Sequence, residues 1–566
     1  MKADISKIRF GVICPDKALS AWQEIALRKL ISQTDIELKL VIHESNRANA
    51  KHPSSDLEGT SQKTAFLWNL YNRLRVKKKS KALQKAETHK LFEGVPAMRC
   101  NFYVLTDGSA ELKTKDITVI ENTQLDFIID FATLKIHGNV LNAARHGVWS
   151  FRFGNLENYS VSIPSFWEIY LEEVLTSAYL IRLTDNLHET IVLKEGHLKT
   201  EIFYPKNIDK IHFEATDWPL KICQDIRNNR TKNLTIKRSV KLNENRRSPS
   251  NLVLFIFFFI QLKLLFKKIN RKLFYTDYWN IGVALSPIQD FLDPKKIPSI
   301  QWFPDLPRSR FMADPFGISI KGELFIVYED FRFDQGVGKI ASFLFDNETF
   351  LENKIVIDEK FHMSYPFLLE HESEIYCIPE TYQANQVRLY RALEFPMRWK
   401  FEKVLIENYA AIDNTPFKYG DTWFLFSTDK HAGPHHNLNI HYSKSIFGPW
   451  KEHPKNPVKT DIRSARPAGT LFTFKRELFR PSMDYSEKIE GRIIINRIMT
   501  LTIDDFREEV YNIVDPFADT IFSDKTHTLS QMGDYTLIDG AKELFIFSNL
   551  SALKYKIKRI YTMLKK

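Results

Sequence analysis

An internal repeat of about 50 residues in the second half of the chain constrains the fold more than any other feature. Four proline-containing segments carry it: ADPF at 313–316, SYPF at 364–367, NTPF at 414–417 and ARPAG at 465–469. Their prolines are 51, 50 and 51 residues apart, and a divergent segment, THTL at 526–529, follows after a longer step. Each segment leads into a turn and a second strand-like run. Such repeats are typical of four-stranded blades, so the sequence predicts an all-β, five-bladed β-propeller. The run YWNIGVALS at 278–286 is expected to supply a strand that closes the ring.

The first strand of each blade lines the centre of a propeller, so the five repeat segments are predicted to converge on one funnel. Their residues are polar where packing would favour apolar side chains. They are Asp314, Tyr365, Asp413, Asn414, Arg466 and His527. The strands that follow end in further polar residues: Asp330, Glu380, Arg480 and Asp484. Any single one of these side chains could have a purely structural role, such as capping a turn. Five polar strand starts around one funnel, however, indicate a binding site.

Acidic groups that crowd together raise one another's pKa, and a protonated acid beside an ionised carboxylate is what glycoside chemistry requires. Asp314, Asp413 and Glu380 are the candidate catalytic residues, and the other polar residues of the funnel are candidate substrate contacts. Arg466 and Arg480 favour an anionic substrate such as a phosphosugar or a nucleotide sugar. The alternative is that these arginines form salt bridges that hold the blades together. No metal site is predicted.

The first part of the chain alternates between strands and helices. A β-α-β unit is expected over 8–15, 18–32 and 36–43, and strands are expected at 117–121 and 125–130, before a helix at 136–145. Alternation of this kind favours a mostly parallel, Rossmann-like sheet with helices on its faces. The sequence therefore predicts a multidomain chain, with an α/β domain at 1–230, a basic linker and apolar helix at 231–274, and the propeller with a basic tail at 275–566.

The apolar run NLVLFIFFFIQLKLLF at 251–266 is short for a membrane span, and basic residues flank it on both sides. Two interpretations remain open. The segment 251–272 lies on a membrane surface as an interfacial helix, or it is a buried helix between two domains.

Targeting, cysteine and charge patterns limit the cellular context. The N-terminus lacks the pattern of a signal peptide, and the four cysteines show no C-x-x-C spacing. A cytoplasmic protein, peripheral to a membrane if the helix is interfacial, is therefore expected. The net charge of +11 falls mainly in linker-like segments without a nucleic-acid-binding motif, so no nucleic-acid partner is predicted.

The propeller half resembles a known family through ADPF with YED, SYPF with PE, DNTPF, SARPAG and RPSMD. These motifs are similar to the propeller domain at the N-terminus of plant glucosamine inositolphosphorylceramide transferases. More distantly, they resemble five-bladed glycosidases of the arabinanase and invertase type. The resemblance to the plant proteins implies a glycan context rather than a named reaction, because their sugar-transfer step belongs to another domain. The glycosidases use carboxylates on successive blades as base, pKa modulator and acid, and Asp314, Asp413 and Glu380 are the matching candidates.

The first domain resembles the formyltransferases of methionyl-tRNA and sugar amines, through LDFIIDFATLKIHGNVLNAARHGVWSF and PSFWEIYLEE. Members of that family place an Asn, a His and an Asp around formyl-tetrahydrofolate. Here the histidine stretch reads Arg152 to Asn155, and His188 falls near the expected Asp. The resemblance therefore implies a degenerate pocket at Arg152, Asn155 and His188 that does not use folate.

Together these observations predict an enzyme of glycan biosynthesis that transfers or processes a sugar at the propeller funnel. Its ligand would be a carbohydrate or a sugar nucleotide, and a nucleotide sugar is the only donor that the residues suggest. One alternative is a non-catalytic carbohydrate-binding or scaffold protein. Another is an active formyl- or acyltransferase that works on an amino-sugar nucleotide.

Overall fold

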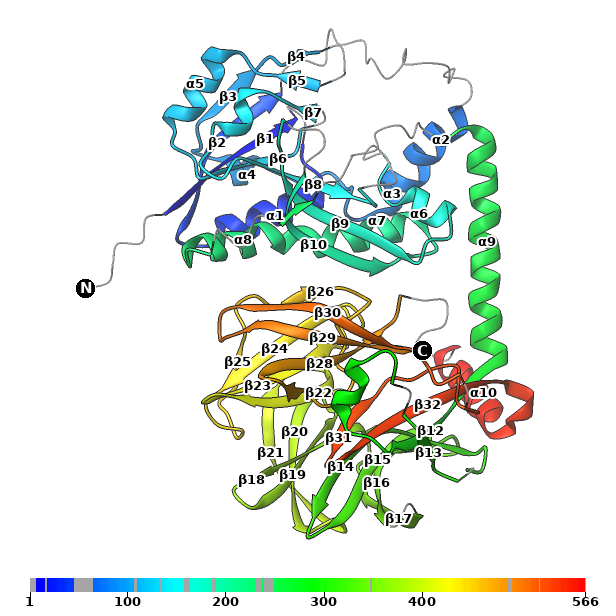
Figure 1. Cartoon of the computed structure of the whole chain (residues 1–566). Helices are drawn as coiled ribbons and strands as arrows, with labels where there is room; N and C mark the ends of the chain where they lie inside the picture. The colour runs from blue at the N-terminus through cyan, green and yellow to red at the C-terminus, as the bar shows by residue number, and fades with distance from the viewer. Residues whose placement is uncertain are drawn as a thin grey trace. The chain divides into compact units, whose positions relative to one another are not determined.

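The computed structural model divides the chain into two compact units, residues 1–265 and 266–566. The boundary lies inside α9 (Asn251–Phe274), the helix that joins the two units (Figure 1). Within the described residues, no helix has both the length and the apolar content that crossing a membrane requires. The structure describes the chain except residues 1–6, 16–17, 45–64, 106–108, 133–134, 157–162, 186–189, 231–235, 239–248, 297, 305, 347–348, 487–490, 519 and 565–566.

The N-terminal unit is built on an eight-stranded sheet. Its strands lie in the order β11 (Ile236–Arg238), β10 (Thr190–Lys199), β9 (Leu175–Arg182), β8 (Val148–Phe153), β6 (Phe127–Asp130), β1 (Ile8–Pro15), β2 (Ile36–Glu44) and β3 (Ala97–Cys100). The five strands from β8 to β3 are parallel, while β9, β10 and β11 pair antiparallel. The sheet is therefore mostly parallel, as the alternation of strands and helices predicts.

Helices cover both faces of this sheet because alternate strand residues point to opposite sides. Phe10 and Val12 of β1 belong to one core with α1 (Ala21–Ile31), α7 (Tyr204–Glu214) and α8 (Trp218–Arg227). Ile13 of the same strand belongs to the other core, together with Ile117 and Ile120 of α5 (Thr114–Asn122).

Two local predictions in this unit are wrong. Residues 117–121 form part of helix α5 rather than a strand, because Ile117 and Ile120, three residues apart, reach the core from one helix face while Val119 stays exposed. The helix expected at 136–145 is reduced to the 3₁₀ turn η3 (Asn139–Asn142), which follows the short strand β7 (Lys135–Ile136).

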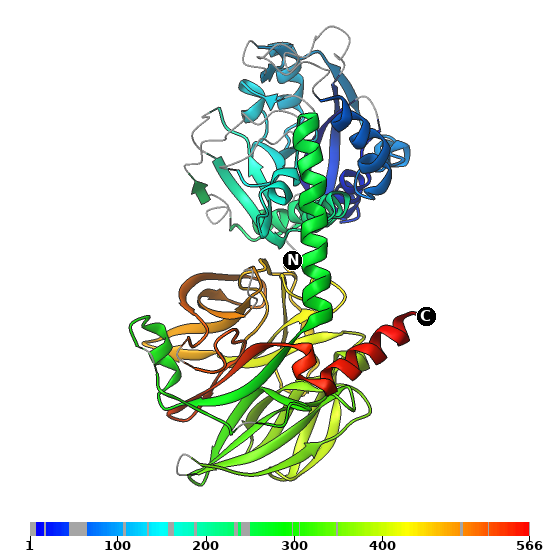
Figure 2. The ribbon, with the colours of Figure 1, turned by 90° about the vertical axis from the view of Figure 1, so that its right-hand side faces the viewer.

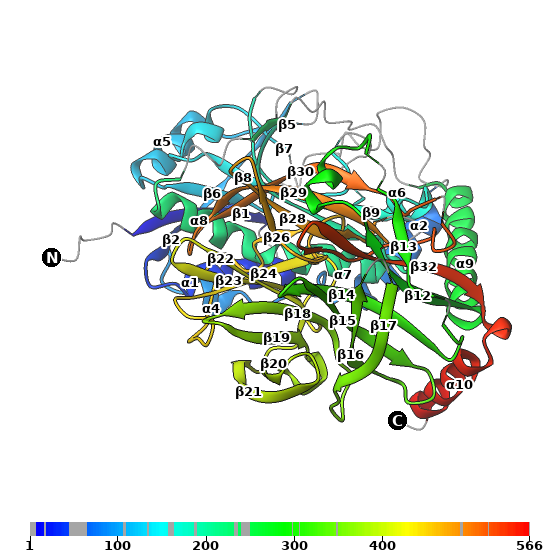
Figure 3. The ribbon, with the colours of Figure 1, turned by 60° about the horizontal axis from the view of Figure 1, so that its bottom comes forward.

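The second unit contains five antiparallel sheets, which confirm the five predicted blades (Figure 3). Blade 1 is β14 (Arg310–Ile320), β15 (Glu323–Arg332), β16 (Val337–Asp346) and β17 (Thr349–Ile357). Blade 2 is β18 (Ser364–His371), β19 (Glu374–Glu380), β20 (Gln386–Glu394) and β21 (Arg398–Glu407). Blade 3 is β22 (Ala411–Tyr419), β23 (Thr422–Asp429), β24 (Asn437–Ser443) and β25 (Lys451–Glu452), with β26 (Lys459–Thr460) beside β24. Blade 4 is β27 (Phe472–Phe474), β28 (Glu477–Asp484), β29 (Arg492–Leu501) and β30 (Phe506–Val514).

Blade 5 joins the two ends of this unit. It contains β31 (Leu529–Met532), β32 (Tyr535–Phe545), β12 (Tyr275–Ala284) and β13 (Ile300–Trp302). The first strand of the unit, β12, pairs with β32 along its whole length, from Tyr275 opposite Phe545 to Ala284 opposite Thr536. This pairing confirms that the 278–286 segment closes the ring. Helix α10 (Leu550–Leu564) follows the last blade.

Candidate functional site

The inner strands of the first three blades carry the same irregularity at their start. In each, the register with the second strand shifts across two residues, at Asp314, at Tyr365 and at Asp413. All three residues have a left-handed backbone, with φ of 54°, 46° and 53°. Such φ values are uncommon for residues other than glycine and gather at functional sites. The bulge turns the side chain of each residue toward the other blades.

The bulges correct the alignment of the repeat. Asp413 matches Asp314 and Tyr365, so the second step, from blade 2 to blade 3, is 48 residues at the bulge and not the 50 that the prolines suggest. Pro315 and Pro366 directly follow the bulged residue, whereas Asn414 takes that place in blade 3 and Pro416 comes two residues later.

Asp314 is a buried hub between blades 1, 2 and 5. Its Oδ2 accepts the backbone N–H of Tyr365 at 3.2 Å, and its Oδ1 accepts the hydroxyl of Thr528 at 3.1 Å. The imidazole of His527 lies 3.4 Å from the same Oδ1, and its other nitrogen lies 2.5 Å from Asp539 Oδ2. Asp539 in turn accepts the backbone N–H groups of His527 and Asp314. The carboxylates of two blades therefore hold His527 between them.

Asp413 is held from blade 4. The Arg466 guanidinium binds both of its carboxylate oxygens, through Nε to Oδ2 and through Nη2 to Oδ1 at 3.3 Å. Arg466 Nη1 also donates to the hydroxyl of Tyr485 at 2.9 Å. On its other side, the backbone N–H of Asp413 donates to Glu380 Oε2 at 3.1 Å. The predicted residues Asp314, Glu380, Asp413, Arg466 and His527 therefore lie in one cluster, which we call the central cluster together with Glu329 and Asp539.

Burial changes the protonation of this cluster. Burial, reinforced by the charge of Asp413, raises the pKa of Glu380 to about 8. Burial and the Asp314 carboxylate raise the pKa of Glu329 well above its ordinary value. Burial also raises the pKa of Asp314 to about 6, although the His527 cation opposes this rise. Near pH 7, Glu380 is therefore mostly a neutral acid.

His527 and Arg466 supply the positive charge. Burial alone would lower the pKa of His527, but the Asp539 and Asp314 carboxylates raise it to about 9. The side chains of His527 and Arg466 remain 18% and 17% exposed, whereas that of Asp413 is 2% exposed. A ligand that approaches the cluster therefore meets two cations before it meets the carboxylates.

Aromatic side chains that the sequence analysis missed flank these cations. Trp279 stacks on His527, with ring centroids 4.0 Å apart, and His435 lies 4.4 Å from Tyr485. Tyr485 also lies under the Arg466 guanidinium, at 5.5 Å. Tyr485 directly follows the RPSMD motif, but Trp279 and His435 lie outside the repeat segments, so no repeat signal marks them. Asp539 was also missed, although it lies in the second strand of the divergent blade.

Arg480 and Asp484 have structural roles instead of the predicted contacts with substrate. Arg480 is fully buried, and its Nε and Nη2 donate to Glu508 at 2.8 and 2.6 Å. Asp484 pairs with Arg492 at 2.9 Å. Both ion pairs join strands within blade 4, whereas the structural alternative expected the arginines to hold one blade to another; of the two arginines, Arg466 does so, through Asp413 of blade 3.

Three further predicted contacts are also occupied inside the propeller. Asp330 is buried beside Arg310, with a nitrogen–oxygen distance of 3.1 Å. Asn414 is fully buried and donates to the carbonyl of Pro379. The hydroxyl of Tyr365 accepts the N–H of Gly469 at 2.6 Å and lies 2.9 Å from Thr415 Oγ1. These side chains are buried among other residues of the propeller and are not open to a ligand.

Asp314, His527 and Asp539 could also hold a metal ion, because one ligand atom of each lies within 4.8 Å of the others. A ligating histidine must be neutral, whereas the two carboxylates keep His527 protonated at pH 7. The residues therefore favour an ion-paired histidine over a metal ligand at this pH.

The predicted formyltransferase-like pocket lies at the carboxyl ends of β6 and β8, where open α/β sheets bind ligands. Arg152 Nη1 donates to Ser150 Oγ at 2.6 Å, and that hydroxyl donates to Asp130 Oδ2 at 3.2 Å. Burial raises the pKa of Asp130 to about 6. The backbone N–H of Asn155 donates to Glu168. His188 lies outside the described residues, so the predicted constellation stays a prediction.

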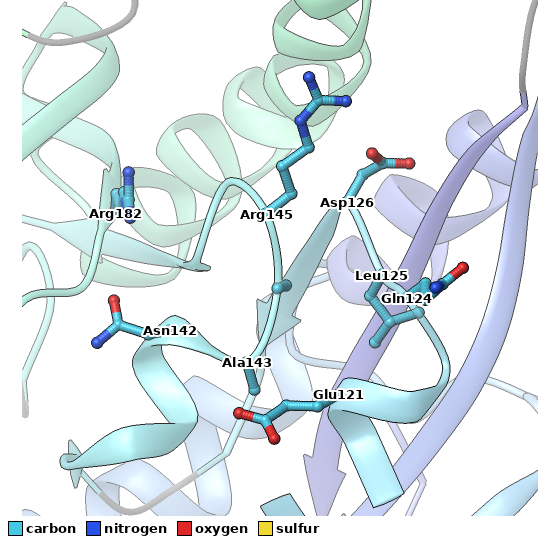
Figure 4. A pocket seen from close by; sticks show the side chains of 9 residues that line it. Glu121, Gln124, Leu125, Asp126, Asn142, Ala143, Arg145 and Arg182 are labelled. Atoms are coloured by element: carbon cyan, nitrogen blue, oxygen red, sulfur yellow. The ribbon is translucent and has the colours of Figure 1, made fainter. Parts of the chain in front are cut away.

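A different hollow, of about 450 Å³, lies at the opposite ends of the same strands (Figure 4). Leu125 and Asp126 precede β6, Arg145 precedes β8, and Arg182 ends β9. The lining mixes acidic and basic side chains, and the sequence analysis did not identify it.

The ion pairs of His527 predict how stability depends on pH. A pKa of about 9 in the folded state exceeds the usual 6.5, so this stabilisation is complete below pH 6.5 and is lost as the pH rises through 9. The shift corresponds to roughly 3 kcal/mol of unfolding free energy. Urea unfolding of the His527→Gln variant between pH 6.5 and 10 should show a smaller loss of stability than the parent. Equal losses of stability in both proteins would contradict the ion pairs assigned to His527.

Part of the propeller is similar in sequence to proteins that have been named. Residues 304–517 match the family model "Glucosamine inositolphosphorylceramide transferase 1, N-terminal". The chain is 37% identical over 213 residues to glucosamine inositolphosphorylceramide transferase 1 of Oryza sativa subsp. indica, covering 36% of this chain and 28% of that protein. It is 33% identical over 209 residues to the protein of the same name from Arabidopsis thaliana, covering 35% and 27%. The chain thus spans about a quarter of the length of these relatives.

Solved structures that the chain matches include a family 117 glycoside hydrolase of Zobellia galactanivorans, with 14% identity, a TM-score of 0.32, and coverage of 48% of this chain and 91% of that one. Another is the α-L-arabinanase of Cellvibrio cellulosa, with 13% identity, a TM-score of 0.28, and coverage of 35% and 77%. The matched span 304–517 contains five residues of the central cluster and ends before His527 and Asp539; the five are Asp314, Glu329, Glu380, Asp413 and Arg466. Most of the propeller, including these five residues, is therefore similar to the N-terminal region of proteins named as transferases.

Proposed function

We propose that the propeller binds an anionic sugar, such as a phosphosugar or a nucleotide sugar, and catalyses its transfer or processing in glycan biosynthesis. One observation carries the proposal: a neutral acid, Glu380, and two carboxylates, Asp314 and Asp413, lie together beneath two cations. The names of the relatives support a transferase. The N-terminal unit would act as an accessory domain, whose Arg152 stands in the histidine stretch of the formyltransferases that it resembles.

The cations and aromatic rings supply the proposed binding step. Arg466 pairs with Asp413 through Nε and Nη2, so its remaining N–H groups and the charge of protonated His527 would attract a phosphate or carboxylate group. Trp279 and Tyr485 offer flat apolar surfaces beside them, which suit the faces of sugar rings. An anionic sugar is therefore favoured over a neutral one.

Each carboxyl group takes one proposed role in the chemical step. Asp314, with its pKa of about 6, is ionised near pH 7 and accepts the proton of the attacking hydroxyl or water. Glu380 protonates the leaving oxygen as the bond from the anomeric carbon to that oxygen breaks and the bond to the attacking oxygen forms. Asp413, whose charge raises the pKa of Glu380, keeps this acid protonated and is itself held by Arg466.

Incubation with a panel of nucleotide sugars and phosphosugars tests this function. Asp314→Asn and Glu380→Gln are each expected to lower kcat/KM at least about a hundredfold, because each removes one proton-transfer group. The rate should fall below a pH of about 6 and above about 8, where Asp314 gains and Glu380 loses its proton. Glu477→Gln, a partly exposed control on blade 4, should change neither kcat/KM nor its dependence on pH. Full activity in both central variants would refute the proposal.

The burial of the carboxylates favours a second candidate, a carbohydrate-binding protein without turnover. Asp413 is 1% and Glu380 is 5% exposed, so the cations are the more accessible groups. Isothermal titration that detects binding of a phosphosugar, lost in Arg466→Ala, with no product formed, would establish this alternative.

A further inference from the structure

Helix α9 runs along the surface of the N-terminal unit over residues 251–265 (Figure 2), and its outer face there carries exposed apolar side chains. Leu254, Phe257 and Gln261 are buried against this unit, with spacings of three and four residues. At about 100° per residue, the positions opposite them form a second stripe. The residues of that stripe are Leu252, Phe255, Ile256, Phe259 and Leu262, which are 37–67% exposed. Burial of one face thus explains only part of the apolar character of this helix.

Another stripe of exposed apolar residues lies beside the exposed stripe of α9. The helix α2 (Phe66–Tyr71) and the π-helical turn η2 (Asn72–Val76) lie beside α9, where the N–H of Leu67 donates to Asn251 Oδ1 at 2.9 Å. The rings of Tyr71 and Phe258 meet at 5.2 Å. The exposed apolar residues of this segment are Phe66, Leu67, Leu70 and Leu74, which are 41–60% exposed. We call the two stripes together the apolar face.

Basic residues border this face, and within residues 251–265 of its helix Lys263 pairs with Glu172 at 2.6 Å. The segment directly after α2 contains exposed Arg73, Arg75 and Lys77 to Lys79, and none of these forms an ion pair with another described residue. Neither the stretch 66–79 nor α9 contains a single Asp or Glu. An exposed apolar surface of this extent marks an interaction site, and its basic border selects a partner with negative charge.

We propose that the N-terminal unit docks on the surface of a bilayer that contains anionic lipids, with the apolar face inserted among the acyl chains. A helix whose opposite side is packed on its own domain lies along the membrane plane and buries one face in the boundary between headgroups and chains. The phenylalanines and leucines supply the buried area, and the basic segment attracts the lipid headgroups. The interfacial interpretation of 251–272 is thereby chosen over a helix buried between domains.

Flotation of the full chain with vesicles tests the proposal. Binding is expected to vesicles of phosphatidylcholine with phosphatidylserine, to be weaker with phosphatidylcholine alone, and to fall as the salt concentration rises. The variant Phe255→Glu/Phe259→Glu should bind at least about tenfold more weakly, because two large apolar side chains no longer insert. Lys77→Gln/Lys78→Gln/Lys79→Gln should lose the preference for phosphatidylserine and keep the weaker binding.

The matched control is Val510→Glu/Tyr511→Glu, which changes two exposed apolar residues of β30 in the propeller and should bind vesicles like the parent. Circular dichroism should show that all variants are folded. The proposal is overturned if the parent binds neither vesicle, or if both glutamate variants bind like the parent. It is also overturned if light scattering shows a dimer of the parent that Phe255→Glu/Phe259→Glu dissociates, because a second copy would then cover the apolar face.

Discussion

Replacement of Gly469 by alanine is expected to lower the unfolding free energy of the propeller by about 4 kcal/mol or more. Gly469 ends the ARPAG segment and has a φ of +119°, which alanine rarely adopts. A Cβ there would lie 1.9 Å from the carbonyl oxygen of Leu529 and 2.5 Å from its carbonyl carbon. Both atoms are backbone, so relief of the clash would separate blade 4 from blade 5. The same shift would disturb the Gly469 N–H that donates to Tyr365 of blade 2.

Gly420→Ala is the matched control for this prediction. Gly420 also has a positive φ, +57°, but an added Cβ would meet no atom within 4 Å. It should therefore show only the backbone cost, about 1–2 kcal/mol. Scanning calorimetry or urea unfolding of the three proteins measures the difference. Equal losses in both variants would show that the contact between blades 4 and 5 is not as close as described.

Replacement of Arg480 by alanine is the second change with a large expected effect, a loss of about 3–5 kcal/mol. Arg480 is fully buried, donates to both carboxylate oxygens of Glu508, and donates to the carbonyls of Ser464 and Ala465. Its removal leaves Glu508 buried with Lys459 as the remaining ion-pair partner at 2.7 Å, and leaves two carbonyls without their donor. Urea unfolding measures the loss.

Arg497→Ala on the neighbouring strand is the control, because Arg497 pairs with Glu477 and Glu509 at a partly exposed position and should cost less than about 1 kcal/mol. The pH dependence gives a further check. Burial would raise the pKa of Glu508, but Arg480 and Lys459 hold it below its usual value. This stabilisation is therefore present above the unfolded pKa and is lost as the pH falls through the folded one. An Arg480→Ala protein as stable as the parent would contradict the assigned role.

The repeat of about 50 residues was sufficient to predict the blades. Residues of similar kind at nearly constant spacing reveal a blade, because each blade must solve the same packing problem. The third blade shows the limit. Pro416 matches the other prolines by spacing, but the bulge lies at Asp413, since backbone conformation follows the strand register and not the nearest proline.

The α/β unit shows a second limit. The residues ITVI at 117–120 have the make-up of a strand, yet they lie in α5, because the core accepts Ile117 and Ile120 from one helix face. Local propensity is weak for so short a segment, and tertiary packing overrides it. The parallel order of the central strands was predictable because it depends on alternation over a long stretch and not on any one segment.

The sequence by itself determined that the second half of the chain is a ring of five blades, and that polar residues stand at their starts. Both features follow from the periodicity of the repeat, which can be read from the sequence without coordinates. Only the tertiary structure decided which of those residues face one another. It placed Arg466 on Asp413, His527 between Asp314 and Asp539, and Arg480 inside blade 4. The physical reason is that the partners of a charged side chain, and its depth of burial, depend on residues that are distant in the sequence, such as Asp314 and Asp539, which lie 225 positions apart.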